Sequence, residues 1–166
     1  ADITSLPEVE KMVDSLYEQF GRIDILVNNA GVTKDELLLS MTPEDWDIVI
    51  RTNLGGLFNC TKAVAKYMMV QKSGRIINIS SVAGERGGRG QSNYAASKGG
   101  LNQLSRYLAT VLAPRIRVNT VTAGGVLRGQ DEAFRRRYIE KTPLGRMAVE
   151  EDFKGAVAYL ASDLSA

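Results

Sequence analysis

The sequence predicts an α/β protein in which a doubly wound parallel sheet is covered by helices on both faces. Helix-like and strand-like segments alternate along the 166 residues, a pattern typical of parallel strands joined by crossover helices. The first strand-like segment, residues 23–27, is short and mainly apolar, as expected of a buried strand. Polar or Gly-rich residues follow these strands, and open α/β sheets bind their ligands at that edge.

The ends of the predicted elements have local signals. Ser5 and Glu8 have the spacing of a capping box at the start of the first helix, and Gly21 is placed to end it. Thr42 is placed to cap the second helix, with a proline directly after it. We expect helices over residues 5–20, 42–58, 92–113, 131–141 and 149–162, and strands over residues 23–27, 75–80 and 116–121.

The composition limits the chemistry that the chain can use. Lys and Arg total 21 against 19 for Asp and Glu, without a long run of one sign, so the charge gives no reason to expect nucleic acid or a membrane as partner. The chain has no histidine and one cysteine, Cys60, which excludes the usual zinc sites and any Ser-His or Cys-His pair. Cys60 is expected in the core. We expect a cytoplasmic protein that binds a small molecule and no metal.

Tyr94 and Lys98, near the start of the helix predicted over residues 92–113, form the strongest chemical signal. Side chains four residues apart lie on the same face of a helix. An isolated tyrosine has a pKa of about 10, and an adjacent ammonium group lowers it. Lys98 is therefore predicted to lower the pKa of Tyr94 and to make it a better proton donor. This spacing is common by chance, and the alternative interpretation is a solvated helix face.

Two serines are predicted at the same edge of the sheet. The strand over residues 75–80 ends at Ser80 and Ser81, just before a Gly-rich loop over residues 84–90 that leads toward Tyr94. A serine hydroxyl there can hold a substrate carbonyl oxygen. The alternative is a serine at the end of a strand that bonds to its own backbone.

Asn53 falls on the apolar stripe of the helix predicted over residues 42–58, so its amide is expected to be buried. Gly55 and Gly56 weaken that helix locally. This would free the Asn53 carbonyl to hold a water that relays protons to Lys98. A structural asparagine with satisfied hydrogen bonds is the alternative.

These residues, taken in order, resemble the short-chain dehydrogenase/reductase family over essentially the whole chain. The separation of 13 residues between Ser81 and Tyr94 identifies Ser81, rather than Ser80, as the match to the catalytic serine of that family. Within the family, the segments over residues 21–27, 74–81 and 90–94 are most similar to 3-oxoacyl-acyl-carrier-protein reductases. The matching residues are Asn28-Asn29-Ala30-Gly31, Asn53, Ser81, Tyr94 and Lys98.

The resemblance implies a Rossmann-like fold, a homotetramer packed through the helices that contain Asn53 and Tyr94, and a nicotinamide cofactor, NADP or alternatively NAD. The implied catalytic residues are Asn53, Ser81, Tyr94 and Lys98. By the same resemblance Asp2 and Ile3 flank the adenine, and Asn28, Ala30 and Gly31 line the adenosine ribose side. Tyr94 and Lys98 also contact the cofactor, Lys98 through the nicotinamide ribose, and Val126 contacts the nicotinamide amide.

A doubly wound dinucleotide-binding domain normally begins with a strand, a Gly-rich turn and a helix that holds the pyrophosphate. No such unit precedes Ala1, and no strand follows the last predicted helix. We therefore expect residues 1–166 to form a single, incomplete Rossmann-like reductase domain that lacks this first unit and the last strand.

The predicted reaction is reduction of a ketone, preferably a 3-oxoacyl thioester, to a secondary alcohol, with hydride transfer to carbon and a proton from Tyr94 to oxygen.

Residues 127–147 match the substrate loop of the family in position and are rich in arginine, which would suit the phosphate of a carrier protein or of coenzyme A. Interleaved acidic residues favour a solvated helix face instead. The alternatives are another substrate, such as a sugar or steroid, and a noncatalytic fragment unable to bind cofactor.

Overall fold

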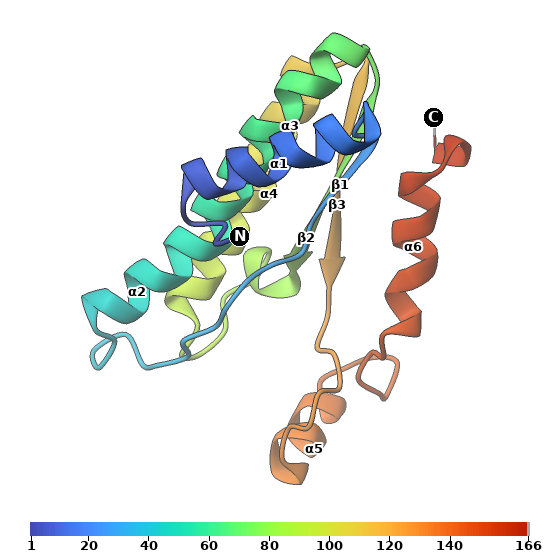
Figure 1. The fold of residues 1–166 in the computed structure, drawn as a ribbon. Helices are drawn as coiled ribbons and strands as arrows, with labels where there is room; N and C mark the ends of the chain where they lie inside the picture. The colour runs from blue at the N-terminus through green and yellow to red at the C-terminus, as the bar shows by residue number, and fades with distance from the viewer. Residues whose placement is uncertain (166) are drawn as a thin grey trace.

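The computed structural model describes residues 1–165 and contains a parallel sheet of three strands (Figure 1). The strands are β1 (Ile25–Asn28), β2 (Gly74–Ser81) and β3 (Ile116–Ala123), in the spatial order β1-β2-β3. Asn28 pairs with Asn78, and Ser81 pairs with Ala123, so β2 and β3 end side by side. The predicted parallel α/β architecture is confirmed.

Helices cover both faces of this sheet (Figure 1). One face is covered by α1 (Leu6–Phe20), α3 (Leu57–Gln71) and α4 (Ser92–Leu112). The other face is covered by α6 (Glu151–Ala161), which contacts β2 and β3. The remaining elements are α2 (Pro43–Ile50), α5 (Glu132–Glu140) and the short turns η2 (Val82–Gly84) and η3 (Asp163–Ser165). Of these, α5 projects beyond the carboxyl ends of the strands.

The helix predicted over residues 42–58 is not continuous. A π-helix, η1 (Arg51–Gly56), separates α2 from α3, and the two glycines predicted to weaken the helix lie at its end. A Cβ atom at Gly56 would lie 2.4 Å from Cδ1 of Ile3, so only glycine lets the N-terminal segment approach this closely. The predicted local weakening is confirmed, and the helical path continues after it as far as Gln71.

The helix ends follow the predicted signals in two cases and differ in a third. Gly21 ends α1 in the left-handed conformation at φ 71°, and the Thr42 hydroxyl caps α2 by accepting from the Asp45 amide at 3.1 Å. The predicted capping box of Ser5 and Glu8 is wrong. The Ser5 side chain makes no capping bond, and the Glu8 carboxylate accepts from the Asp2 amide at 3.0 Å while the Ser5 amide donates to the Asp2 carbonyl at 3.1 Å.

Strand β1 starts two residues later than predicted. The amide and the carbonyl of Ile23 are both bonded to the side-chain amide of Gln71, at 2.9 Å each, and so are not available to a neighbouring strand. Apart from the helix predicted over residues 42–58, the other predicted strands and helices occur within a few residues of their expected ends. No helix among residues 1–165 is long and apolar enough to cross a membrane.

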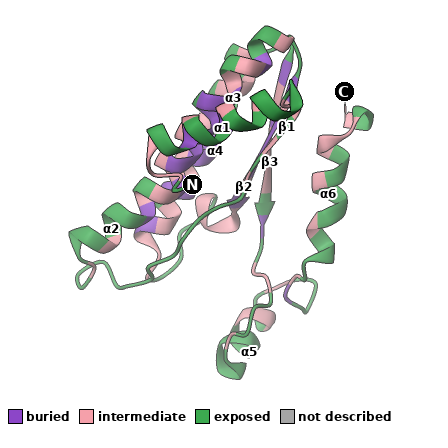
Figure 2. Ribbon diagram, in the orientation of Figure 1, coloured by how far each residue is buried: buried purple, intermediate pink, exposed green. Residues whose placement is uncertain are grey.

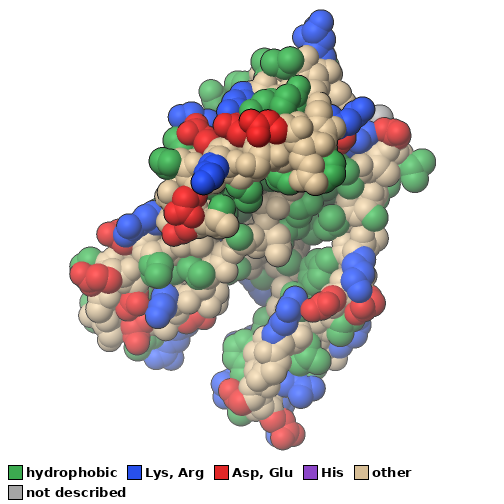
Figure 3. Space-filling model, in the orientation of Figure 1, with side chains coloured by type: hydrophobic (Ala, Val, Ile, Leu, Met, Phe, Trp, Pro, Cys, Tyr) green, Lys and Arg blue, Asp and Glu red, His purple; other side chains and the backbone are tan. Residues whose placement is uncertain are grey.

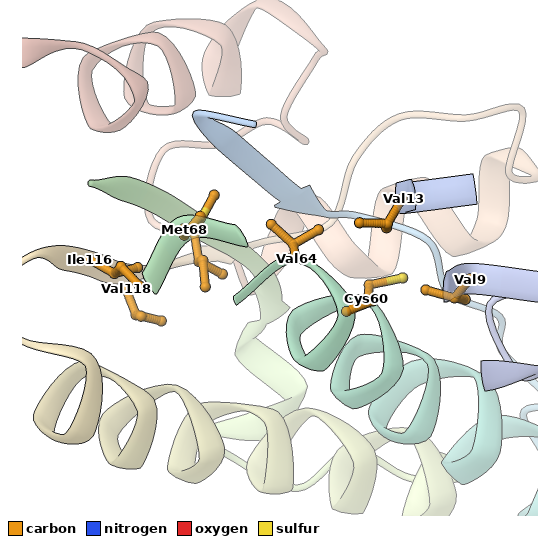
Figure 4. Close-up of a cluster of buried hydrophobic side chains, with 9 residues drawn as sticks. Val9, Val13, Cys60, Val64, Met68, Ile116 and Val118 are labelled. Atoms are coloured by element: carbon orange, nitrogen blue, oxygen red, sulfur yellow. The ribbon is translucent and has the colours of Figure 1, made fainter. Parts of the chain in front are cut away.

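The main hydrophobic core lies between the sheet and the helices α1, α3 and α4, where the buried residues concentrate (Figure 2). Side chains from α1, α3 and β3 point toward one another in this core (Figure 4). Cys60 is buried among them as predicted, and burial raises the pKa of its thiol. Each fully buried Val, Ile or Met side chain contributes about 1.5–3 kcal/mol to stability. The buried members are Val9, Val13, Cys60, Ala63, Val64, Met68, Ile76, Ile116 and Val118.

Candidate active site at the carboxyl ends of the strands

A cleft of about 850 Å³ opens where β2 and β3 end. In Figure 3 it lies at the hollow between the part of the molecule that contains α2 and the part that contains α5. Five of the predicted site residues line this cleft, although they come from four different parts of the sequence. These residues are Gly31, Ser81, Tyr94, Lys98 and Val126.

A smaller pocket of about 200 Å³ gathers most of the remaining predicted residues, namely Ile3, Asn28, Ala30 and Asn53. Lys98 lines both spaces and therefore connects them. Asp2 lines neither of these two spaces. Its carboxylate accepts from the amide of Thr4 at 2.8 Å and from the Thr4 hydroxyl at 2.9 Å.

Ser81 is the last residue of β2, and its backbone is still extended at φ −146° and ψ 152°. Its Oγ accepts a hydrogen bond from the amide of Ala83 at 3.2 Å, so the local bond expected of a serine at a strand end is present. The same hydroxyl also lies close enough to Tyr94 to act on the pKa of the phenol. Ser81 therefore has a structural contact and a contact within the cleft. The neighbouring Ser80 has a buried Oγ for which no hydrogen-bond partner is found among residues 1–165.

Tyr94 lies in the first turn of α4, where it is partly buried in the cleft wall. Burial raises the pKa of its phenol above the ordinary value, because the charged form loses hydration. The hydrogen-bonding interaction with Ser81 lowers this pKa, and the carboxylate of Asp35 raises it. The net direction is upward, so the phenol keeps its proton at neutral pH.

Lys98 lies one helical turn after Tyr94 and is 5% exposed. Its Nζ donates to the carbonyl oxygen of Ile79 at 2.7 Å and lies 5.7 Å from the centre of the Tyr94 ring. Burial lowers the pKa of the ammonium group. The pKa of Tyr94 is raised in the chain by itself, with burial as the largest cause, and the lowering of this pKa by Lys98 stays a prediction.

Asn53 is 1% exposed, so its predicted burial is confirmed. Its Oδ1 accepts from the amide of Val32 at 2.8 Å, and its Nδ2 donates to the carbonyl of Val32 at 3.0 Å. Nδ2 also donates to the hydroxyl of Ser97 at 3.2 Å. The side chain is therefore satisfied, as the structural alternative requires, and it ties η1 to the loop after β1. The proton relay through its main-chain carbonyl stays a prediction.

Gly31 and Asn28 lie at the end of β1, on the side predicted to face the cofactor. A Cβ atom at Gly31 would lie 3.1 Å from Oδ1 of Asn53 and 4.0 Å from Nζ of Lys98, so the backbone approaches both groups closely. Asn28 donates to Oδ1 of Asn78 at 2.8 Å and to the hydroxyl of Thr61 at 3.1 Å. These bonds fix the strand end that leads into the loop.

Val126 follows β3 and lines the cleft in a segment that is tied to α5 and to the residues before α6. Its carbonyl accepts from Nε2 of Gln130 at 2.8 Å, and it forms a bridge with Ala148. The phenol oxygen of Tyr138 accepts from the amide of Gly125 at 2.5 Å, which brings α5 onto this segment. Tyr138 was not among the predicted site residues, and nothing in the local pattern of α5 distinguishes it.

Asn93 lies in the segment over residues 90–94 and had no predicted role at the site. It is 0% exposed, and its side chain bonds to the backbone at three points around Tyr94. The sequence feature that could have identified Asn93 is its place directly before Tyr94, as a polar side chain in the first turn of a helix.

Residues 1–166 match the family described as enoyl-(acyl carrier protein) reductase. The chain is similar to proteins named 3-oxoacyl-[acyl-carrier-protein] reductase. The protein of Synechocystis sp. is 45% identical, over 100% of this chain and 68% of that protein. The protein of Thermotoga maritima is 43% identical, over 99% of this chain and 69% of that protein. The protein of Staphylococcus aureus is 42% identical, over 98% of this chain and 68% of that protein.

Among solved structures, the chain is similar to a gluconate 5-dehydrogenase from Burkholderia cenocepacia in complex with NADP and tartrate. The TM-score is 0.95 at 34% identity, and the match covers 99% of this chain and 68% of that one. The sequence motifs, the parallel sheet with its cleft and these similarities agree, and the chain belongs to the short-chain dehydrogenase/reductase family of oxidoreductases.

Proposed function

We propose that this chain catalyses the NADPH-dependent reduction of a ketone to a secondary alcohol, with Tyr94 as the proton donor. The observation that carries the proposal is that Ser81, Tyr94 and Lys98 line one cleft at the carboxyl edge of the sheet. NADPH, when bound, supplies the hydride. The four catalytic residues proposed are Asn53, Ser81, Tyr94 and Lys98.

Tyr94 is suited to donate a proton. Its pKa is raised by burial, so at neutral pH it is a phenol rather than a phenolate. When the ketone carbon accepts a hydride, its oxygen becomes an alkoxide, which takes the phenol proton. General acid catalysis of this kind contributes about 10²–10⁴-fold to the rate.

Ser81 is suited to hold the carbonyl oxygen. Its Oγ already accepts from the Ala83 amide, which leaves the hydroxyl proton to donate. A donor aimed at the oxygen where negative charge develops stabilises the transition state more than the ground state.

Lys98 is suited to hold the cofactor, and its surroundings fit a nicotinamide ribose. An ammonium group has three donor protons, and one of them is used by the Ile79 carbonyl. Nζ lies beside Gly31, which lines the larger cleft and whose lack of a Cβ leaves room next to the ammonium group. The cofactor contacts proposed, besides Tyr94 and Lys98, are Asp2, Ile3, Asn28, Ala30, Gly31 and Val126.

Asn53 is proposed to anchor, through its main-chain carbonyl, a water that returns the proton to Lys98 and Tyr94. The supporting observation is that Asn53 lies within a π-helix, where the regular α-helical hydrogen bonding is interrupted.

The preferred substrate is a 3-oxoacyl thioester, because three relatives at 42–45% identity have the name 3-oxoacyl-[acyl-carrier-protein] reductase. NADP is favoured over NAD, since the similar gluconate 5-dehydrogenase was solved with NADP. That structure also supports a second candidate function, oxidation or reduction of a sugar acid in the same cleft.

We further propose that the protein is cytoplasmic and forms a homotetramer. The tetramer is supported by exposed apolar side chains on α2, α3 and α4, namely Trp46, Phe58, Tyr107 and Val111.

Replacement of the proposed proton donor tests the function. In the intact protein, Tyr94→Phe should abolish NADPH-dependent reduction of an acetoacetyl thioester, whereas Tyr159→Phe, at an exposed tyrosine of α6, should keep it. Tyr94→Phe with near wild-type turnover would refute the assignment. A panel with a sugar-acid ketone separates the two substrate classes. Absence of nicotinamide fluorescence changes with both NADPH and NADH would favour a noncatalytic fragment.

A further inference from the structure

Asn93 uses both donors and its acceptor in bonds to the backbone. Its Nδ2 donates to the carbonyl of Lys34 at 3.0 Å and to the carbonyl of Asp45 at 3.0 Å. Its Oδ1 accepts from the amide of Tyr94 at 2.7 Å. The side chain is 0% exposed, so no water competes for these bonds.

The three bonds join three segments that are distant in the sequence. Lys34 lies in the loop after β1, Asp45 lies in α2, and Tyr94 lies in the first turn of α4. Because each bond ends on a main-chain atom, the amide holds the three backbones relative to one another, whatever the side chains there do. The α2–α4 contact is also one of the larger helix contacts of the molecule.

Two further hydrogen bonds join the loop after β1 to the residues just before α4 and at its N-cap. The amide of Glu36 donates to the carbonyl of Gly90 at 2.8 Å, and Nε2 of Gln91 donates to Oδ2 of Asp35 at 3.0 Å. The residues directly before Tyr94 are thus tied to the loop after β1 at three successive places. Asn93 is the buried one of these ties, and of the three only it bonds to the backbone of Tyr94.

The bond from the Tyr94 amide to Asn93 gives a partner to one of the first amides of α4. The first amides of a helix have no partner within the helix, so a side-chain oxygen that accepts from one of them fixes the local backbone. A proton donor has to reach its acceptor within hydrogen-bond distance, and a displacement of about 1 Å can cost about 10²-fold in rate.

We propose that Asn93 is a positioning residue that keeps the Tyr94 phenol within hydrogen-bond distance of Ser81 and the substrate carbonyl. This inference rests on the proposed function, because it assigns a purpose to the fixed position of Tyr94. Asn93 has no contact with the reacting atoms in this assignment, and its effect is transmitted through the Tyr94 backbone.

Asn93→Ala in the intact protein tests this, with Gln71→Ala as the matched control. Gln71 also pairs with the backbone through both ends of its amide, bonding the amide and the carbonyl of Ile23 at 2.9 Å each, but it does so at the amino end of β1. Both variants should unfold at lower temperature than the wild type. Only Asn93→Ala should lower kcat for an acetoacetyl thioester, by about 10–100-fold, and KM for ketone and for NADPH should stay within about two-fold of the wild type.

Asn93→Ser provides a smaller change if the alanine variant does not fold, and the same loss of kcat is expected in it. A folded Asn93 variant with wild-type kcat would overturn the proposal, as would a loss of kcat no larger than that of Gln71→Ala. Failure of both Asn93 variants to fold would also overturn it, since the side chain would then serve the fold alone. Tyr94→Phe in the same assay separates the two levels: if Tyr94→Phe is inactive and Asn93→Ala is not impaired, only the positioning role fails. If wild-type protein reduces no ketone, the proposed function fails and this inference with it.

Discussion

Lys98 follows Tyr94 by one helical turn, yet its ammonium group bonds to the Ile79 carbonyl at 2.7 Å and lies 5.7 Å from the centre of the Tyr94 ring. The lysine is thus anchored to the strand edge rather than left mobile on the helix. With one donor used in this way, the others can reach a ligand in the cleft. The position of Lys98 therefore suits ligand binding. The direction of the Tyr94 pKa shift comes from burial, Ser81 and Asp35.

The Tyr94 pKa should respond to Asp35. The carboxylate raises this pKa, so Asp35→Asn should lower it. Reduction requires the protonated phenol, and its rate therefore falls as pH rises through the Tyr94 pKa. In Asp35→Asn the alkaline decline of kcat/KM should begin at lower pH than in the wild type. The measurement is a pH–rate profile at constant ionic strength, and a decline that stays in place or moves to higher pH contradicts the prediction.

Lys98 should contribute to cofactor affinity. Lys98→Met keeps a long unbranched side chain but removes the buried ammonium group and its donor protons. Hydrogen bonds from charged groups are worth about 1.5–3 kcal/mol. The dissociation constant of NADPH should rise by about 10-fold or more. Titration of nicotinamide fluorescence measures it, with Lys62→Met on the exposed side of α3 as the control. Equal affinities in the two variants would remove Lys98 from the cofactor site.

The segment after β3 should not tolerate a side chain at Gly125. A Cβ atom there would lie 2.5 Å from Cζ of Tyr138, so the ring would have to shift and its hydrogen bond from the Gly125 amide would be disturbed. Gly125→Ala should therefore lower turnover. At Gly155, in α6, a Cβ would meet nothing within 4 Å, and Gly155→Ala should instead stabilise the protein by about 0.5–1 kcal/mol. Turnover and thermal unfolding of both variants are the measurements, and equal behaviour of the pair argues against a Tyr138 contact.

Two adjacent methionines of α3 should differ sharply in their effect on stability. Met68 is 0% exposed in the core, whereas Met69 is 54% exposed. Met68→Ala leaves a cavity and should lower the free energy of unfolding by about 2–5 kcal/mol, while Met69→Ala should change it by less than about 0.5 kcal/mol. Urea denaturation of both variants compares them directly. Similar losses would mean that α3 packs in a different rotation from the one described.

Much of the fold was accessible from local patterns. The alternation of apolar strands with amphipathic helices predicts the parallel sheet, because these periodicities depend only on backbone geometry. Thr42 and Gly21 mark helix ends because their effects act within one turn. The predicted capping box of Ser5 and Glu8 is wrong because it considers only those two residues. The amide of Asp2, which lies outside the pattern, donates to the Glu8 carboxylate.

For the candidate site, the sequence by itself determined which residues are available and where along the strands and helices they stand. It placed Ser81 at a strand end, Tyr94 and Lys98 on one helix face, and Asn53 on a buried stripe. Only the tertiary structure decided what these side chains contact, since Lys98 meets Ile79 and Asn93 meets Lys34 across separations that no local periodicity encodes. It also decided the direction of the Tyr94 pKa, because burial depends on how distant segments pack together, and here burial outweighs the nearby hydroxyl.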